Sequence, residues 1–132
     1  MCIRDRAAGL TAGIDFILET GFDLITRHET ELTQICLDKL QGEADVEIYG
    51  PANMESRAGV VSFNLRGVHP HDVAQVLNES GIAVRAGHHC TQVLHSKLGL
   101  QASVRLSVGV YNTEEEILRL VTSLQHVRDL LK

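Results

Sequence analysis

Short strand-like runs alternate along this chain with segments of helical periodicity, and this alternation limits the folds that the chain can adopt. Four runs have the β-branched content or two-residue alternation of strands, at 45–49, 60–65, 82–85 and 103–108. Helical spacing, or boundaries marked by Pro and Gly, occurs at 8–20, 23–41, 70–80, 92–98 and 113–131. The order, two helices and then β-β-α-β-α-β-α, predicts an α/β layered domain of the α+β kind, with a small, mostly antiparallel sheet covered by helices.

Residues at the segment ends define the expected helices. Thr113-Glu-Glu-Glu116 is a capping box, and the apolar residues that follow it from Ile117 have helical spacing. Asp23 is the expected N-cap of the second helix, and Gly42 is its expected end.

Three parts of the chain are expected to differ in origin. Residues 1–6 fit no amphipathic pattern and are expected to be a non-native remnant. Residues 7–22 are expected to form a helix of an incomplete neighbouring domain or an interdomain connection, and residues 23–132 a C-terminal small domain. Both helices within 8–41 are expected to be less integrated with the sheet than the later elements.

Composition excludes several classes of protein. Apolar residues make up 44% of the 132 residues, enough for a core, and the formal net charge of −5 argues against a nucleic-acid surface. No apolar run is long enough to span a membrane, and no signal peptide is recognisable. The three cysteines are an odd number without paired spacing, which favours a reducing, cytoplasmic setting over a disulfide framework.

The segment Arg85-Ala-Gly-His-His-Cys90 carries the strongest candidate for chemistry. A strand is expected to end in this segment, and Gly87 allows the chain to turn. Cationic neighbours or a helix N-terminus lower the pKa of a thiol and so make it nucleophilic. Arg85, His88 and His89 are the expected neighbours, so Cys90 is predicted to be a reactive thiolate. The alternative is a small apolar residue in the core, where two adjacent histidines are uncommon.

A zinc site is the other alternative for this segment. His88, His89, Cys90 and His95 have suitable donor atoms. Their spacing matches no closed zinc pattern, and adjacent residues tend to point in different directions, so no metal site is predicted.

Arg105 lies among apolar residues of the strand Ser103-Val-Arg-Leu-Ser107. A strand arginine either faces water or binds an anion, and its guanidinium matches a carboxylate in a two-pronged geometry. A partner with an α-carboxylate is therefore a candidate, and a solvated side chain is the alternative.

Five segments, in this order, resemble the end of a SufS-type cysteine desulfurase. They are Arg57-Ala-Gly-Val-Val-Ser-Phe-Asn64, Val68-His-Pro-His-Asp-Val73, Gly81-Ile-Ala-Val-Arg-Ala-Gly-His-His-Cys90, Val104-Arg-Leu-Ser107 and Tyr111-Asn-Thr-Glu-Glu-Glu-Ile117. The resemblance runs from about residue 8 to the C-terminus. The short Arg-Ala-Gly-His-His-Cys segment is similar to the SufS group, since the NifS/IscS group has a longer loop around its cysteine.

The resemblance implies a pyridoxal-phosphate enzyme of the class V aminotransferase superfamily, with fold type I, that converts L-cysteine to L-alanine. Cys90 would carry the resulting persulfide, and Arg105 would hold the substrate carboxylate. Arg85, Gly87, His88 and His89 would shape the loop and its electrostatics. Thr91-Gln-Val-Leu94 departs from the family, which usually has Ala after the Cys and Pro near position 93.

The family's cofactor lysine follows a His in a large N-terminal domain. Lys39, Lys97 and Lys132 have no such context, so this chain is expected to be a fragment that lacks the cofactor lysine and is inactive alone. The complete enzyme is implied to be a homodimer that passes sulfur to a SufE- or SufU-like acceptor for iron–sulfur cluster assembly. The alternatives are a stand-alone sulfur carrier and a zinc-binding regulatory domain.

Overall fold

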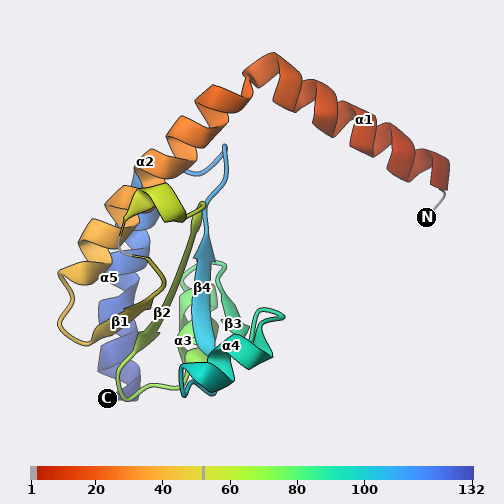
Figure 1. Ribbon diagram of the computed structural model, residues 1–132. Helices are drawn as coiled ribbons and strands as arrows, with labels where there is room; N and C mark the ends of the chain where they lie inside the picture. Colours follow the sequence, from red (N-terminus) through yellow and green to blue (C-terminus); the bar gives the residue numbers. More distant parts are fainter. Residues whose placement is uncertain (1–2, 52) are drawn as a thin grey trace.

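The computed structural model describes residues 3–51 and 53–132 (Figure 1). Its helices are α1 (Ile3–Thr20), α2 (Phe22–Gln41), α3 (Pro70–Glu79), α4 (Gln92–Lys97) and α5 (Glu114–Leu131), with a short 3-10 helix, η1 (Met54–Ser56). Its strands are β1 (Val46–Tyr49), β2 (Val60–Leu65), β3 (Arg85–Gly87) and β4 (Ser103–Ser107). Within these residues, every helix is too short or too polar to cross a membrane.

The strands form one sheet in the order β1-β2-β4-β3, and each pair of neighbours is antiparallel. β4 pairs on both sides, with Ser62 of β2 opposite Arg105 and Arg85 of β3 opposite the same arginine. The small antiparallel sheet and its helices confirm the predicted fold class.

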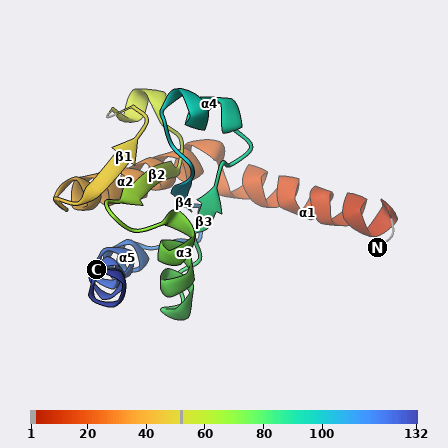
Figure 2. The ribbon, with the colours of Figure 1, turned by 90° about the horizontal axis from the view of Figure 1, so that it is seen from below.

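Alternation along the strands separates a helix-covered face from a more polar face. Phe63 and Leu65 of β2 and Val104 and Leu106 of β4 are buried beneath the helices. Figure 2 shows α3 and α5 on one side of the sheet and α4 on the other. Residues of α2 and α5, such as Leu37 and Leu124, complete the core. The opposite face therefore carries Ser103 and Arg105, because successive side chains of a strand point to opposite sides.

The two N-terminal helices differ in how they join the domain. α2 packs into the core through Leu32, Cys36, Leu37 and Leu40, so the expectation that this helix is less integrated with the sheet than the later elements was wrong. α1 has no buried residue and projects away from the domain in both views (Figures 1 and 2).

The boundaries of these helices also differ from the expected ones. Residues 3–6, which fit no amphipathic pattern in the sequence, form the first turn of α1. α2 begins at Phe22 after Gly21 and has no side-chain cap, so Asp23 lies inside the helix as an acidic residue of its first turn. An acidic side chain there still interacts favourably with the helix dipole.

β3 begins at Arg85, three residues after Ile82, where the strand predicted over 82–85 was expected to begin. Ile82 donates its amide to Leu77 O at 2.9 Å, and Gly81 has a φ of 74°, so the chain closes the end of α3 before it extends. Pairing with β4 begins only at Arg85 and runs to Gly87. The expected strand over 82–85 is therefore corrected to Arg85–Gly87, which places Arg85 within the sheet.

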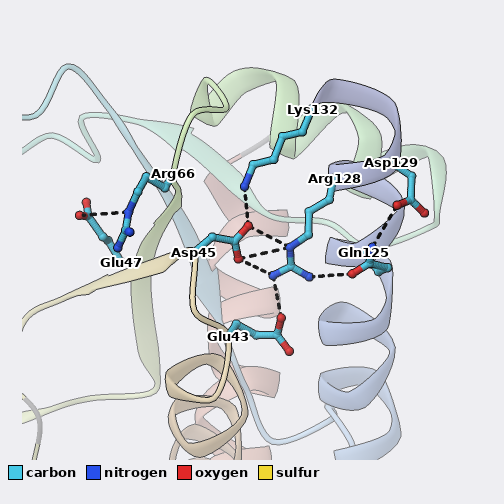
Figure 3. Close-up of polar contacts among 8 residues, drawn as sticks. All are labelled: Glu43, Asp45, Glu47, Arg66, Gln125, Arg128, Asp129 and Lys132. Atoms are coloured by element: carbon cyan, nitrogen blue, oxygen red, sulfur yellow. Dashed lines mark hydrogen bonds and ion pairs between the residues drawn. The ribbon is translucent and has the colours of Figure 1, made fainter.

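A group of ion pairs joins the start of β1 to the end of α5 (Figure 3). Arg128 Nη2 lies 2.7 Å from both Asp45 Oδ1 and Glu43 Oε2, and Arg128 Nε lies 3.0 Å from Asp45 Oδ2. Lys132 contacts the same carboxylate. The Arg128 guanidinium holds the pKa of Asp45 well below its ordinary value, against the opposing effect of desolvation, and Lys132 adds to the lowering. These contacts fix the C-terminal helix on the α2–β1 connection.

We expect Asp45→Asn to lower the free energy of unfolding by about 1 kcal/mol, because it removes a two-pronged charged contact that is only partly exposed to solvent. A lowered carboxyl pKa contributes stability at neutral pH that is lost as the pH falls below the ordinary value, so the difference between the two proteins should shrink in acid. Urea unfolding at several pH values measures both effects.

Glu47→Gln is the matched control for this prediction. Glu47 Oε1 lies 4.0 Å from Arg66 Nε, and both side chains are more than half exposed (Figure 3). Loss of this ion pair should therefore have little effect on the free energy of unfolding. Equal effects of the two substitutions would show that the Asp45 contacts do not stabilise the fold.

Candidate active site

The strand β3 runs directly into a tight turn that presents Cys90. Gly87 has a φ of 134°, and His89 and Cys90 have φ values of 52° and 62°. Thr91 donates its amide to His88 O at 2.8 Å, which closes the turn. Two consecutive central residues with positive φ are typical of a type I′ turn, where Asn and Gly are the usual residues. His89 and Cys90 therefore lie in a backbone region that side chains rarely adopt, and such strain is concentrated at functional sites.

Cys90 and Cys36 have opposite environments. Cys90 is exposed at the tip of the turn, whereas Cys36 is fully buried in the core on α2. Burial raises the pKa of the Cys36 thiol to about 12, despite a smaller opposing effect of the Arg57 charge. Cys36 is consequently an inert core residue, and Cys90 is the described cysteine that is placed to react with other molecules.

Two arginines lie side by side on the polar face of the sheet. Arg85 and Arg105 are direct partners in the β3–β4 pairing, so their side chains leave the sheet on the same side. Like charges in opposite positions are unfavourable unless an anion lies between them. Arg105 is half-buried, its Nε is buried without a hydrogen-bond partner, and no acidic side chain of the described residues forms an ion pair with either arginine. The planar guanidinium groups of such a pair have the donor geometry that suits a carboxylate.

His89 connects the turn to the centre of the sheet. Its Nε2 lies 2.9 Å from Ser103 O, and because a carbonyl only accepts, this nitrogen carries the hydrogen. Its half-buried position lowers its pKa from the ordinary 6.5, the bond to Ser103 opposes this, and the charges of Arg105 and Arg85 lower it further. The lowered pKa favours the neutral form of His89, so the sequence-based expectation of a cationic His89 beside Cys90 is not supported.

The other two histidines of the segment differ in burial. His88 is exposed, and its ring meets the His95 ring edge-on with centroids 5.5 Å apart. His95 is 5% exposed, and its ring nitrogens bond to Thr91 and Ser103. Sequence reasoning treated His95 only as a zinc donor, since nothing local indicates that it lies beneath the turn. Within residues 3–51 and 53–132, no three His, Cys, Asp or Glu side chains converge as metal ligands would.

The site is an open surface of this chain. A cavity of about 240 Å³ lies on the helix side of the sheet, lined by residues such as Leu106, Ile117 and Leu120. Neither Cys90 nor the arginine pair lines it. A substrate held at Arg105 would therefore be only partly enclosed by the described residues.

The lysines do not fit the role of a cofactor lysine. An imine-forming lysine needs a desolvated amine, which deprotonates readily. Lys39 on α2 and Lys97 at the end of α4 are exposed, and Lys132 is ion-paired with Asp45 at the far end of α5. The environments of these three lysines therefore do not fit the attachment of pyridoxal phosphate.

We expect His89→Gln to flatten the dependence of stability on pH. Because the folded-state pKa of His89 is lowered, the unfolded chain takes up this proton first, and wild-type stability falls as the pH drops below about 6.5. Gln does not titrate, so the variant should lose less stability between about pH 8 and pH 5. His126→Gln, at an exposed site on α5, shows what the loss of any histidine does to the slope; identical slopes for both variants would contradict the prediction.

Matches to known proteins extend over almost the whole chain. The model of the family described as Aminotransferase class-V matches residues 5–120. A cysteine desulfurase of Haloferax volcanii is 44% identical over 125 residues, which are 95% of this chain and 29% of that protein. A probable cysteine desulfurase of Halalkalibacterium halodurans is 48% identical over 93% of this chain and 30% of its own length. The chain thus spans about 30% of the length of the relatives that it matches.

Solved structures agree with the sequence matches. The apo cysteine desulfurase of Thermococcus onnurineus aligns with a TM-score of 0.88 and 42% identity over 93% of this chain and 30% of that one. The Escherichia coli cysteine desulfurase CsdA aligns with a TM-score of 0.85 and 27% identity over 94% of this chain and 30% of its own. These matches confirm the resemblance to cysteine desulfurases that the five sequence segments indicated. The chain belongs to the aminotransferase class-V family, and the relatives that it matches are cysteine desulfurases.

Proposed function

We propose that this chain provides the sulfur-accepting part of a cysteine desulfurase, with Cys90 as the nucleophile. The observation that carries the proposal is the exposed Cys90 at the tip of a strained turn that directly follows the strand pairing Arg85 with Arg105, and no acidic side chain of the described residues forms an ion pair with either arginine. Strain of this kind persists where the surrounding structure holds it, commonly at functional sites. Escherichia coli CsdA, a relative of similar fold, is described in an S-sulfonic acid form, which is a fully oxidised thiol.

The proposed reaction is a sulfur transfer from L-cysteine to Cys90. The Cys90 thiolate attacks the substrate sulfur, so that an S–S bond forms while the substrate C–S bond breaks. The electron pair of the broken bond stays with the substrate carbon, which takes up a proton and becomes the methyl group of L-alanine. Cys90 is left as a persulfide. In the complete enzyme, bound pyridoxal phosphate supplies the electron sink for this chemistry.

Arg105 is proposed to hold the substrate carboxylate, with Arg85 beside it. A guanidinium can make two parallel hydrogen bonds to a carboxylate, and the unpartnered Nε of Arg105 leaves donor capacity for such a ligand. The direct pairing of the two arginines across β3 and β4 adds a second positive charge on the same side. His88, His89 and Gly87 are proposed to shape the turn and its electrostatics.

The remaining parts of the active site are proposed to lie outside these 132 residues. Pyridoxal phosphate would be held by a lysine of a large domain, since the lysines of this chain do not fit that role. The apolar side chains of α1, including Leu10, Ile14 and Phe16, would pack against that domain, with 7–22 as the connection and 23–132 as the small domain. Residues 1–6 remain proposed as a non-native remnant.

We further propose that the complete protein is a cytoplasmic, homodimeric enzyme of the SufS type. The short segment from Arg85 to Cys90 supports the SufS group, and the exposed position of Cys90 suits delivery of the persulfide to a second protein. A SufE- or SufU-like protein would be that acceptor, and iron–sulfur cluster assembly would use the sulfur.

A persulfide assay with the purified chain tests this proposal. With a small-molecule persulfide donor, we expect Cys90 to gain the mass of one sulfur atom, because its thiol is exposed, while buried Cys36 stays unmodified. Mass spectrometry of the separated peptides measures both sites, and Cys90→Ser is the control. With L-cysteine and pyridoxal phosphate instead, we expect neither alanine nor persulfide.

The two arms of the assay separate the alternatives. Absence of persulfide on Cys90 would refute its role as sulfur acceptor, and formation of alanine by the chain would refute the placement of the cofactor lysine outside it. A stand-alone sulfur carrier would behave like the proposed part in the first arm. The two possibilities differ in the DNA upstream of the gene. The proposed enzyme needs an upstream reading frame that encodes a His-Lys cofactor site, whereas a stand-alone carrier does not.

A further inference from the structure

A buried histidine lies beneath the turn that presents Cys90 and is not needed by the proposed chemistry. His95, on α4, is 5% exposed, although it follows exposed residues of the same short helix. Burial of an imidazole is unfavourable unless both ring nitrogens have partners. His95 meets this condition, and its partners indicate what it does.

The two ring nitrogens of His95 bond to two different segments. Nδ1 lies 3.1 Å from Thr91 O and 3.3 Å from Thr91 Oγ1, and Nε2 lies 3.0 Å from Ser103 Oγ. Because the Thr91 carbonyl only accepts, Nδ1 carries a hydrogen, and Nε2 is paired with the Ser103 hydroxyl. The ring therefore links the end of the turn to the first residue of β4.

Each partner of His95 also holds the turn itself. Thr91 closes the turn through its amide, 2.8 Å from His88 O, and its hydroxyl donates to the same carbonyl at 2.7 Å. Ser103 accepts from His89 Nε2 through its carbonyl at 2.9 Å. His95 therefore links Thr91, which follows Cys90, to Ser103. Ser103 in turn accepts the hydrogen bond from His89, which precedes Cys90.

We propose that His95 is a positioning residue that keeps Cys90 in its left-handed turn and holds this turn on the end of the β3–β4 pair that carries Arg85 and Arg105. Of its two links, the bond to Ser103 is the one that fixes the turn to the sheet, because Thr91 O already accepts the amide of His95 within α4 at 3.1 Å. The way in which His95 holds the turn follows from the fold alone. Its consequence for sulfur transfer rests on the proposed function of Cys90.

Variants at His95 separate the two links. Gln can place its amide group near the position of Nε2 and keep the bond to Ser103, whereas Asn reaches only the position of Nδ1, and Leu keeps neither. His126→Gln makes the same chemical change at an exposed site on α5 and is the matched control. Ser103→Ala removes the hydroxyl partner with a small change in volume and serves if His95→Leu does not fold.

Two measurements on the intact chain report the position of the turn. Amide exchange of Thr91, followed by NMR, reports the closing hydrogen bond, and exchange of Phe63 in β2 reports the integrity of the sheet. The ratio of Cys90 alkylation rates with iodoacetate and with iodoacetamide reports proximity to Arg85 and Arg105, because the negatively charged reagent is attracted by them and both reagents react with the same thiolate.

We expect Thr91 exchange to accelerate at least about tenfold in His95→Leu, His95→Asn and Ser103→Ala, with Phe63 exchange unchanged. The alkylation ratio should fall at least about threefold in the same variants. Both quantities should stay within about twofold of wild type in His95→Gln and His126→Gln.

Wild-type exchange and ratios in His95→Leu, or in Ser103→Ala, would overturn the positioning role. Failure of His95→Gln to restore them would overturn the link through Ser103. Neither measurement involves persulfide, so a failure of Cys90 to accept sulfur would refute the proposed function and leave the positioning result to stand by itself.

Discussion

β4 is the element on which both the core and the candidate site depend. It pairs with β2 on one side and with β3 on the other, so the sheet divides without it. Val104 and Leu106 point into the core, and Ser103 and Arg105 point to the opposite face. The packing that stabilises the domain thus fixes the register of Arg105 against Arg85 and the position of Ser103 beneath the turn. A shift of one residue in this pairing would exchange the two faces and remove the site.

Several features of the structure are unfavourable for an isolated domain and reasonable for one part of a larger enzyme. Two arginines face each other without an acidic partner among the described residues, two non-glycine residues have positive φ, and α1 exposes a series of apolar side chains. Each has a physical cost that a substrate, a reaction or a neighbouring domain can offset. The chain spans about 30% of the length of related cysteine desulfurases, which is consistent with the proposal that these partners lie in the rest of the protein.

Local patterns in the sequence predicted most of the fold. The capping box at Thr113 and Glu116, the apolar spacing of α5 and the strands at 60–65 and 103–108 agree with the structure, because each depends on neighbouring residues. The same reading picked out Cys90 and Arg105 as candidates, and the roles assigned to them stay predictions.

The features that sequence reasoning missed depend on contacts between distant segments. The position of β3 follows from how Ile82 closes α3 and from where β4 pairs, and neither is visible in the run 82–85. The burial of His95 depends on Ser103, eight residues away on another element. The positive φ of Cys90 could not be foreseen, since Asn and Gly are the residues that usually indicate such a turn.

The central claim is that the fold holds Cys90 in a strained, left-handed conformation for the sake of its thiol. A comparison of the free energies of unfolding of Cys90→Gly and Cys90→Ala tests this most directly, since both variants lack the thiol and only Gly adopts a φ of 62° without strain. We predict that Cys90→Gly is the more stable variant by about 1 kcal/mol, because the strain of a left-handed residue exceeds the entropy that Gly loses on folding. A Cys90→Ala variant as stable as Cys90→Gly, or more stable, would contradict the account.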